Sequence, residues 1–219
     1  MKYKAIGFDL DGTLVNTYVN HTDLSGVNIT VLRSLGFPVD EIWVDRDPIS
    51  RQPFYEWLKN NGRYSEKAYY DKILDDRCLE IEKQGAVGAN IYLGIMETLS
   101  KLKNEGYKLG VVTRGGHEYA IQVLSAHNML NFFDVIHGRD DFSYSDAKPS
   151  PMAMVHLSED FGVPLEDILY VGDSITDYQS AHDAGVDFAG VLTGGGSVKI
   201  WSQLNVIIIN SVADIVSIL

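Results

Sequence analysis

The sequence has a single cysteine, Cys78, among its 219 residues. A single thiol cannot close an internal disulfide, which excludes the disulfide-stapled scaffolds of small secreted proteins and favours a reducing compartment. We expect Cys78 to be a buried structural thiol.

The chain also lacks an excess of basic residues and any long apolar run. Its 18 Lys and Arg stand against 30 Asp and Glu, and the formal charge of −12 argues against a basic nucleic-acid groove. The start of the chain reaches Asp9 before any run long enough for a signal peptide. The apolar stretch 206–209 is far below the roughly 18 residues of a membrane-spanning helix. We therefore expect a soluble, cytoplasmic protein that binds a small ligand, with no nucleic-acid or membrane partner.

Six short apolar runs alternate with helical patterns and predict a parallel sheet. The runs are residues 3–8, 108–113, 133–137, 168–172, 188–193 and 206–209. Between them, the spacings of Ile95, Leu99 and Leu102 mark one face of a helix. Strand and helix alternate from Tyr92 onward, so we predict a doubly wound α/β fold with helices on both faces of the sheet.

One segment, residues 16–87, interrupts the alternation. It has the pattern of several polar, aromatic-rich helices, and a glycine-containing return at residues 85–88 ends it. We predict an α/β catalytic core of residues 1–15 and 88–219 that carries residues 16–87 as an inserted helical cap. A cap placed after the first strand would lie over the carboxyl end of that strand, where open α/β sheets bind ligands.

The first strand ends in Asp9-Leu10-Asp11-Gly12-Thr13. Gly12 lets the backbone bend, so that one carboxylate can face an electrophile while the other reaches a leaving-group oxygen as general acid. An Asp-Gly turn followed by a helix-capping Thr explains the same residues without any chemistry. A second acidic site favours the chemical interpretation.

That second site is Gly172-Asp173-Ser174-Ile175-Thr176-Asp177, directly after another apolar run. Asp173 is predicted to point from the end of its strand toward the same crevice as Asp9. Asp177 either binds the metal or supports its ligands, or it caps the following helix, since Ser174-x-x-Asp177 is an N-terminal capping pattern. Both interpretations stay open.

Asp9, Asp11 and Asp173, if they converge, require a cation. Two carboxylates about 4 Å apart repel each other by about 4 kcal/mol at an effective dielectric constant of about 20. A set of oxygen ligands at a phosphate-handling site favours Mg²⁺. The six histidines show no paired metal spacing, which argues against zinc.

Two basic residues are placed to bind a phosphoryl group. Arg114 follows Thr113 at the end of a predicted strand, and the two glycines after it offer N–H groups at a helix start. Lys148 is followed by Pro149 and Pro151, which fix the local backbone as a positioned ammonium requires. Solvated surface charge is the ordinary explanation for a lone Lys or Arg, and the placement of these two argues against it.

In order and spacing, four elements resemble the haloacid dehalogenase superfamily: residues 9–13, Thr113, Lys148 and residues 172–177. The helical insertion and Leu14-Val15 after the first motif look like the phosphoglycolate phosphatase branch. The resemblance covers nearly the whole chain. It implies a Mg²⁺-dependent phosphatase that hydrolyses small phosphorylated metabolites, phosphoglycolate-like substrates among them, through an aspartyl-phosphate.

The resemblance also implies site roles. Asp9 would be the nucleophile, and Asp11 the general acid and then the general base. Asp9 and Asp173 would bind Mg²⁺ with the backbone carbonyl of Asp11. Thr113 and Lys148 would hold the phosphate, and Lys148 would also offset the charge on Asp9.

Two departures from the family pattern bear on the reaction. Many relatives have Asn after the Thr of the second motif, whereas this chain has Arg114, which either contacts the substrate or faces solvent. Haloalkanoate dehalogenases of the superfamily lack the second Asp of the first motif, so Asp11 favours phosphoryl transfer over dehalogenation.

Three other functions compete with a phosphatase. A phosphomutase of the beta-phosphoglucomutase type would differ in its cap, where Arg46 and Arg51 are candidate substrate contacts or ordinary surface charges. A serine esterase with Ser174 as nucleophile needs a downstream Asp and His pair, and the only Asp-x-x-His, residues 134–137, lies upstream. A non-catalytic phosphate- or Mg²⁺-binding protein needs no second carboxylate such as Asp11.

Overall fold

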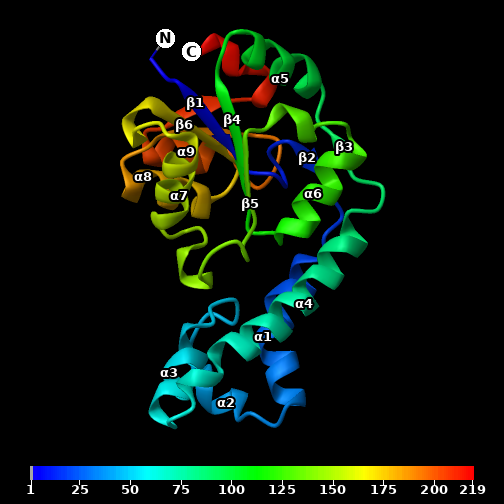
Figure 1. The fold of residues 1–219 in the computed structure, drawn as a ribbon, viewed down its shortest axis with the longest axis vertical. Coiled ribbons are helices and arrows are strands. Elements are labelled where there is room, and N and C mark those ends of the chain that lie inside the picture. Colours follow the sequence, from blue (N-terminus) through cyan, green and yellow to red (C-terminus); the bar gives the residue numbers. More distant parts are fainter. Residues whose placement is uncertain (1) are drawn as a thin grey trace. The chain divides into compact units, whose positions relative to one another are not determined.

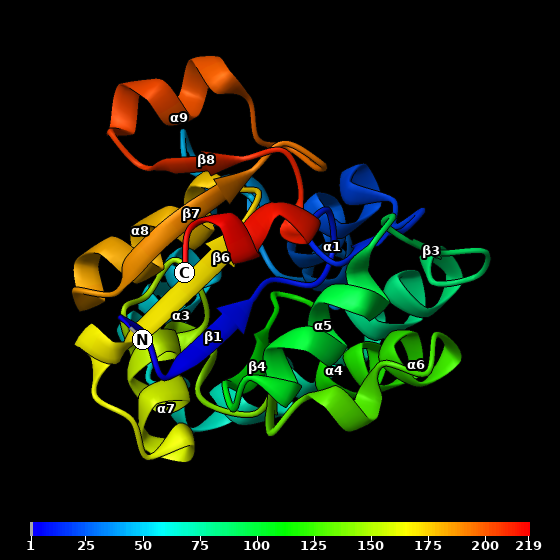
Figure 2. The same ribbon diagram turned by 90° about the horizontal axis from the view of Figure 1, so that it is seen from above.

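The computed structural model describes residues 2–219, and a six-stranded parallel sheet forms the core of its α/β part (Figure 1). Its strands are β1 (Ala5–Phe8), β4 (Lys108–Val112), β5 (Val135–His137), β6 (Ile168–Gly172), β7 (Asp187–Val191) and β8 (Ile207–Ile209). Their order is β5-β4-β1-β6-β7-β8, and Figure 2 shows the succession from β4 through β1, β6 and β7 to β8. β1, β4 and β6 are short apolar runs with almost every residue buried, as expected for strands that are covered on both faces.

Helices cover both faces of this sheet (Figure 2). α7 (Met152–Phe161) and α8 (Ile175–Ala184) pack on one face, and α9 (Val198–Leu204) adds the buried Trp201 to the same apolar cluster. α5 (Ile95–Asn104), α6 (His117–Ala126) and the 3-10 helix η5 (Val212–Ser217) lie on the other face. The predicted doubly wound α/β fold is therefore confirmed, and a strand forms in each of the six predicted segments.

Two short strands mark where the insertion leaves the α/β unit and returns to it. β2 (Val15–Asn16) pairs antiparallel with β3 (Asn90–Ile91), so that Val15 lies opposite Ile91. Three further 3-10 turns connect elements of the α/β unit: η2 (Leu130–Phe132), η3 (Tyr144–Asp146) and η4 (Leu165–Asp167).

The chain divides into two compact units. The α/β unit takes in the chain up to Tyr18 together with Ala86–Leu219, and the other unit is Val19–Gly85. This second unit lies inside the predicted insertion of residues 16–87, and its elements are helices joined by loops. It contains α1 (His21–Ser34), α2 (Val39–Ile42), α3 (Gln52–Asn60), the 3-10 helix η1 (Tyr64–Glu66) and α4 (Lys67–Gly85).

Aromatic rings fill the interior of the helical unit. The ring of Phe37 meets those of Phe54, Trp57 and Tyr70 edge-on, with centroids 5.0, 5.4 and 5.0 Å away. Such edge-to-face pairs add to the stabilisation that comes from burying the rings. Cys78 is buried on α4, as predicted. None of the helices within residues 2–219 has both the length and the apolar character needed to cross a lipid bilayer.

Candidate active site

The carboxyl ends of β1, β4 and β6 lie side by side, and each is followed by a predicted site residue. Asp9 follows β1, Thr113 follows β4 and Asp173 follows β6, and all three side chains are buried. The chain continues from β1 to β4 on one side and places β6 on the other, so the strand order reverses at β1. Ligands of open α/β sheets bind in the crevice beyond such a reversal.

Three buried carboxylates meet at this edge. Asp9, Asp173 and Asp177 each offer one oxygen, and these oxygens all lie within 4.8 Å of one another. The structure thus brings Asp9 and Asp173 together, and the third member of this group is Asp177 rather than Asp11.

Lys148 joins two of these carboxylates. Its buried Nζ donates to Asp9 Oδ1 at 2.7 Å, to Asp177 Oδ1 at 2.5 Å and to the Tyr170 hydroxyl at 2.8 Å. Burial alone would lower the pKa of Lys148, but the charges of Asp177 and Asp9 outweigh burial and hold that pKa well above its usual value. The ammonium is therefore charged across the physiological pH range.

Burial dominates the electrostatics of the acids. It raises the pKa of Asp9 well above the usual value, against the opposing effect of Lys148, and the neighbouring carboxylates raise it further. Burial and the charge of Asp177 also raise the pKa of Asp173. Lys148 offsets only one of the three negative charges. The oxygen donors and the remaining charge fit a hard divalent cation such as Mg²⁺.

Asp177 caps the helix that follows it, which is one of its two predicted roles. Its Oδ2 accepts from the backbone N–H of Ser174 at 3.0 Å, and Ser174 Oγ accepts from the N–H of Asp177, which is a complete capping box at the start of α8. Its Oδ1 faces Lys148. Helix capping therefore fixes the carboxylate that holds the buried ammonium.

Asp11 lies outside the group of three carboxylates. Gly12 has φ of 82°, a left-handed conformation that favours glycine, and its N–H donates to Val15 O at 2.7 Å in a tight turn. This turn leaves the carboxyl of Asp11 half-buried beside two hydroxyl groups. Thr17 Oγ1 donates to Asp11 Oδ1 at 2.7 Å, and the Tyr119 hydroxyl donates to the same oxygen.

The segment after β4 has the form of an anion site. Thr113 Oγ1 accepts from the N–H of Gly115 at 3.0 Å, and α6 begins directly after Gly116. The N-terminus of a helix carries the positive end of its dipole, and at α6 the N–H of the first residue, His117, donates to Asp140 Oδ1 at 2.7 Å. Arg114 is half-buried, and among the described residues its guanidinium has no hydrogen bond or ion pair.

The two predicted cap arginines belong to the helical unit and pair with acids there. Arg46 pairs with Glu56 at 2.6 Å on the surface. The Arg51 side chain is only 1% exposed and pairs with Asp71 at 3.2 Å and Asp75 at 2.8 Å, which links the start of α3 to α4. This geometry favours a structural role for Arg51.

Several residues that hold the site together were not predicted from the sequence. The hydroxyl of Tyr170 accepts from Lys148 and donates to Val112 O at 2.8 Å, which ties the ammonium to β4. The N–H of Gly195 donates to Asp173 Oδ2 at 2.5 Å from the loop after β7. The glycine run 194–196 after a predicted strand is a signal that could have marked this loop, whereas Tyr170 has only the pattern of a core aromatic residue.

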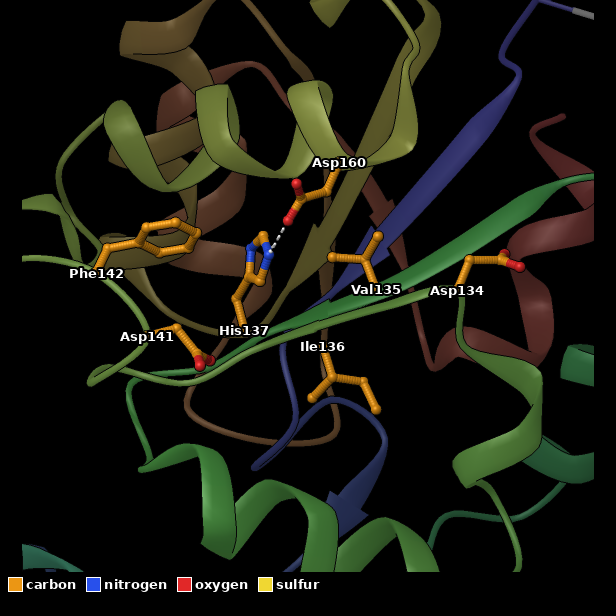
Figure 3. A pocket seen from close by; sticks show the side chains of 7 residues that line it. All are labelled: Asp134, Val135, Ile136, His137, Asp141, Phe142 and Asp160. Carbon is orange, nitrogen blue, oxygen red and sulfur yellow. Dashed lines mark hydrogen bonds and ion pairs between the residues drawn. The ribbon is translucent and has the colours of Figure 1, made fainter.

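A separate depression of about 500 Å³ lies along the edge strand β5 (Figure 3). Figure 3 shows Val135 and Ile136 leaving the strand on opposite sides and His137 pointing toward Asp160. His137 Nε2 lies 2.8 Å from Asp160 Oδ2. The described residues that line this depression are Asp134, Val135, Ile136, His137, Asp141, Phe142 and Asp160. None of them is a predicted site residue.

The chain resembles known hydrolases in both sequence and structure. Residues 6–191 match the family model described as haloacid dehalogenase-like hydrolase. A phosphoglycolate phosphatase of Nitrosospira multiformis is 28% identical over 195 residues, which cover 83% of this chain and 80% of that protein. A phosphoglycolate phosphatase of Vibrio vulnificus is 30% identical over 200 residues, with coverages of 87% and 84%. The crystal structure of a predicted phosphoglycolate phosphatase from Haemophilus somnus 129pt matches with a TM-score of 0.66 and 28% identity, over 100% of this chain and 98% of that one.

Proposed function

This chain belongs to the haloacid dehalogenase-like hydrolase family, and from that premise we propose that it is a Mg²⁺-dependent phosphatase that hydrolyses small phosphomonoesters through an aspartyl-phosphate on Asp9. The observation that carries the proposal is the position of Asp9 at the end of the central strand. Its carboxylate accepts a hydrogen bond from Lys148 and lies close to that of Asp173. The names of the relatives support a phosphoric monoester hydrolase and a phosphoglycolate-like substrate.

In the first half of the reaction, an Asp9 carboxylate oxygen attacks the phosphorus of the ester. The bond between phosphorus and the leaving oxygen breaks, and that oxygen takes a proton from Asp11, so that an alcohol departs and Asp9 carries the phosphoryl group. Attack requires ionised Asp9, which burial disfavours. The ammonium of Lys148, which donates a hydrogen bond to Asp9, favours the ionised form of Asp9. This is the first role that we assign to Lys148.

In the second half, Asp11 is the base. Its carboxylate takes a proton from a water molecule, the water oxygen attacks phosphorus, and the bond between phosphorus and Asp9 breaks. Inorganic phosphate and the free Asp9 carboxylate result, and Asp11 is again protonated for the next substrate. The half-buried side chain of Asp11, outside the group of three carboxylates, suits a residue that must meet both a leaving group and water.

Asp9 and Asp173 would hold the Mg²⁺, with the backbone carbonyl of Asp11. When bound, the ion supplies positive charge to the phosphoryl oxygens and to the carboxylates. Asp177 keeps Lys148 in place through Oδ1 and caps α8 through Oδ2.

The phosphoryl oxygens would be held by the segment after β4 and by Lys148. The Thr113 hydroxyl and the guanidinium of Arg114 are the donors that we assign, since both belong to the segment that follows a central strand. Preorganised donors of this kind stabilise charge on the transferring group without reorganising during the reaction.

The test is phosphate release from a panel of phosphoglycolate, sugar phosphates, nucleotides and 4-nitrophenyl phosphate, with Mg²⁺ or with a chelator. Asp9→Asn should reduce turnover on the order of 10³-fold or more, as loss of a nucleophile does in other covalent enzymes. Unchanged turnover in Asp9→Asn would remove the nucleophile assignment. A hexose 1-phosphate followed by phosphorus NMR separates the mutase, because isomer formation faster than phosphate release would favour that reaction.

A further inference from the structure

Tyr119 connects two parts of the site that the sequence leaves unrelated. It lies in the first turn of α6 with no exposed surface, and its hydroxyl donates to Asp11 Oδ1 across 108 positions of the chain. Every residue of this contact belongs to the α/β unit.

The ring of Tyr119 packs directly on the segment that follows β4. A Cβ atom at Gly115 would lie 2.6 Å from Cδ1 and 2.9 Å from Cε1 of the ring, too close for any residue other than glycine. The N–H of Gly115 in turn donates to Thr113 Oγ1. The ring thus fixes the backbone of the anion site, while the hydroxyl reaches Asp11.

Two hydroxyl groups converge on one oxygen of Asp11. Thr17 Oγ1 donates to Oδ1 at 2.7 Å, and the Tyr119 hydroxyl donates to the same atom. The terminal torsion of an aspartate has a broad preference, so a half-buried carboxyl is not oriented by its own rotamer. Two donors on Oδ1 set the plane of the carboxyl and direct its second oxygen.

We propose that Tyr119 is a positioning residue that holds the Asp11 carboxyl in the orientation needed for proton transfer to the leaving oxygen. The inference rests on the proposed function, in which Asp11 protonates the leaving group. Proton transfer is effective only within hydrogen-bond reach and in the correct direction, and small misplacements of a catalytic group cost large factors in rate. Because the same side chain packs on Gly115, Tyr119 also sets the direction of Asp11 relative to the phosphate-binding segment.

The dependence of rate on the leaving group gives the diagnostic readout. An alkyl leaving group is a poor one and needs its proton during bond breaking, whereas 4-nitrophenolate departs without it. A residue that positions the general acid therefore matters for alkyl phosphates and hardly for 4-nitrophenyl phosphate. A residue that only supports the fold matters equally for both.

Tyr119→Phe keeps the ring on Gly115 and removes only the hydroxyl. We expect kcat/KM for an alkyl phosphate such as phosphoglycolate or glycerol phosphate to fall about 10-fold, part of the 10²- to 10⁴-fold that a general acid contributes. For 4-nitrophenyl phosphate the fall should stay within about 2-fold.

Tyr3→Phe is the matched control. Tyr3 is 1% exposed and its hydroxyl donates to the carboxylate of Asp187 at 2.8 Å, at the amino-terminal end of the sheet. The same chemical change there should leave the ratio of the two rates as in the wild type.

A loss of equal size on both esters, or no loss on the alkyl ester, overturns the positioning role of Tyr119. A wild type that releases phosphate from no ester of the panel above overturns the proposed function, and this inference with it. Selective loss on the alkyl ester, with the ratio kept in Tyr3→Phe, supports both.

Discussion

At the scale of single residues, the site keeps charged groups in positions where burial disfavours their charge. Asp9, Asp173 and Asp177 are buried together although desolvation disfavours their ionised forms, and one ammonium serves two of them. Such an arrangement is costly without a further cation, because unpaired buried charges destabilise a fold. The folding stability of the protein should therefore depend on both Mg²⁺ and pH.

Mg²⁺ should stabilise the fold more at higher pH. Burial raises the pKa of Asp9 and Asp173 in the folded state, so without metal the folded protein binds more protons than the unfolded chain above the ordinary carboxyl pKa, and its stability falls as pH rises. Metal binding competes with these protons. The rise in melting temperature on adding Mg²⁺ should thus be larger at about pH 7.5 than at about pH 5.

Differential scanning fluorimetry with Mg²⁺ or a chelator at both pH values measures this effect. The double variant Asp9→Asn, Asp173→Asn is the control and should lose the metal-dependent shift. Equal shifts for the wild type and this variant would show that Mg²⁺ binds elsewhere.

At the scale of elements, the edge strand β5 is fastened to its neighbours by the side chain that precedes it. Asp134 Oδ2 accepts from the N–H of Leu109 on β4 at 2.8 Å, and both of its oxygens accept from Lys103 on α5 at 2.8 Å. Burial would raise the pKa of Asp134, but Lys103 and the Leu109 N–H outweigh it, and the pKa lies below its usual value. The carboxylate thus secures both a strand and a helix.

Asp134→Asn should lower the free energy of unfolding by about 1 kcal/mol at neutral pH, since the interaction is partly screened by solvent. A depressed folded pKa contributes stability above the ordinary carboxyl pKa, and this contribution is lost as pH falls through the folded value. The difference between wild type and variant should therefore shrink below about pH 4. Urea unfolding across this range measures it, with the exposed Asp183→Asn as control, and a difference that does not change with pH would contradict the assignment.

The same scale explains what could be predicted from the sequence. The central strands are apolar runs because both of their faces are covered, so the sequence pattern alone indicates their positions and the acids that end them. It does not indicate the roles of Tyr119 and Tyr170, because an aromatic residue in a helix or strand pattern is ordinarily core. Their hydroxyl contacts depend on how α6 and β6 pack beside β1 and β4, and no local pattern encodes that packing.

At the scale of the whole molecule, the chain forms two units, each with its own interior. The two arginines of the helical unit show that residues with the same charge can have different structural roles. Sequence alone treats Arg46 and Arg51 alike. In the structure, Arg46 is exposed, whereas Arg51 is buried between Asp71 and Asp75. Residue spacing did not reveal this, because burial of a cation depends on the packing of α3 against its neighbours.

Arg51→Met should therefore destabilise the helical unit by about 3 kcal/mol, because it removes the charged hydrogen bonds of a buried guanidinium to two half-buried carboxylates. Arg46→Met should change stability by less than about 1 kcal/mol, as for exposed ion pairs. Chemical unfolding of both variants, together with KM for phosphoglycolate at a temperature where both are folded, tests the two roles. A raised KM in Arg51→Met with unchanged stability would instead favour substrate contact.

The small β2–β3 pair has a consequence for how this architecture can be varied. Asn16 lies opposite Asn90, so the points of departure and return are already neighbours within the α/β unit. The β2–β3 pair already holds the two ends of any segment inserted between them. The entropic cost of closing that segment as a loop therefore rises only slowly with its length. One insert can thus be exchanged for another, or for a short hairpin turn, while the register of the main sheet and the carboxylates at its edge stay as they are.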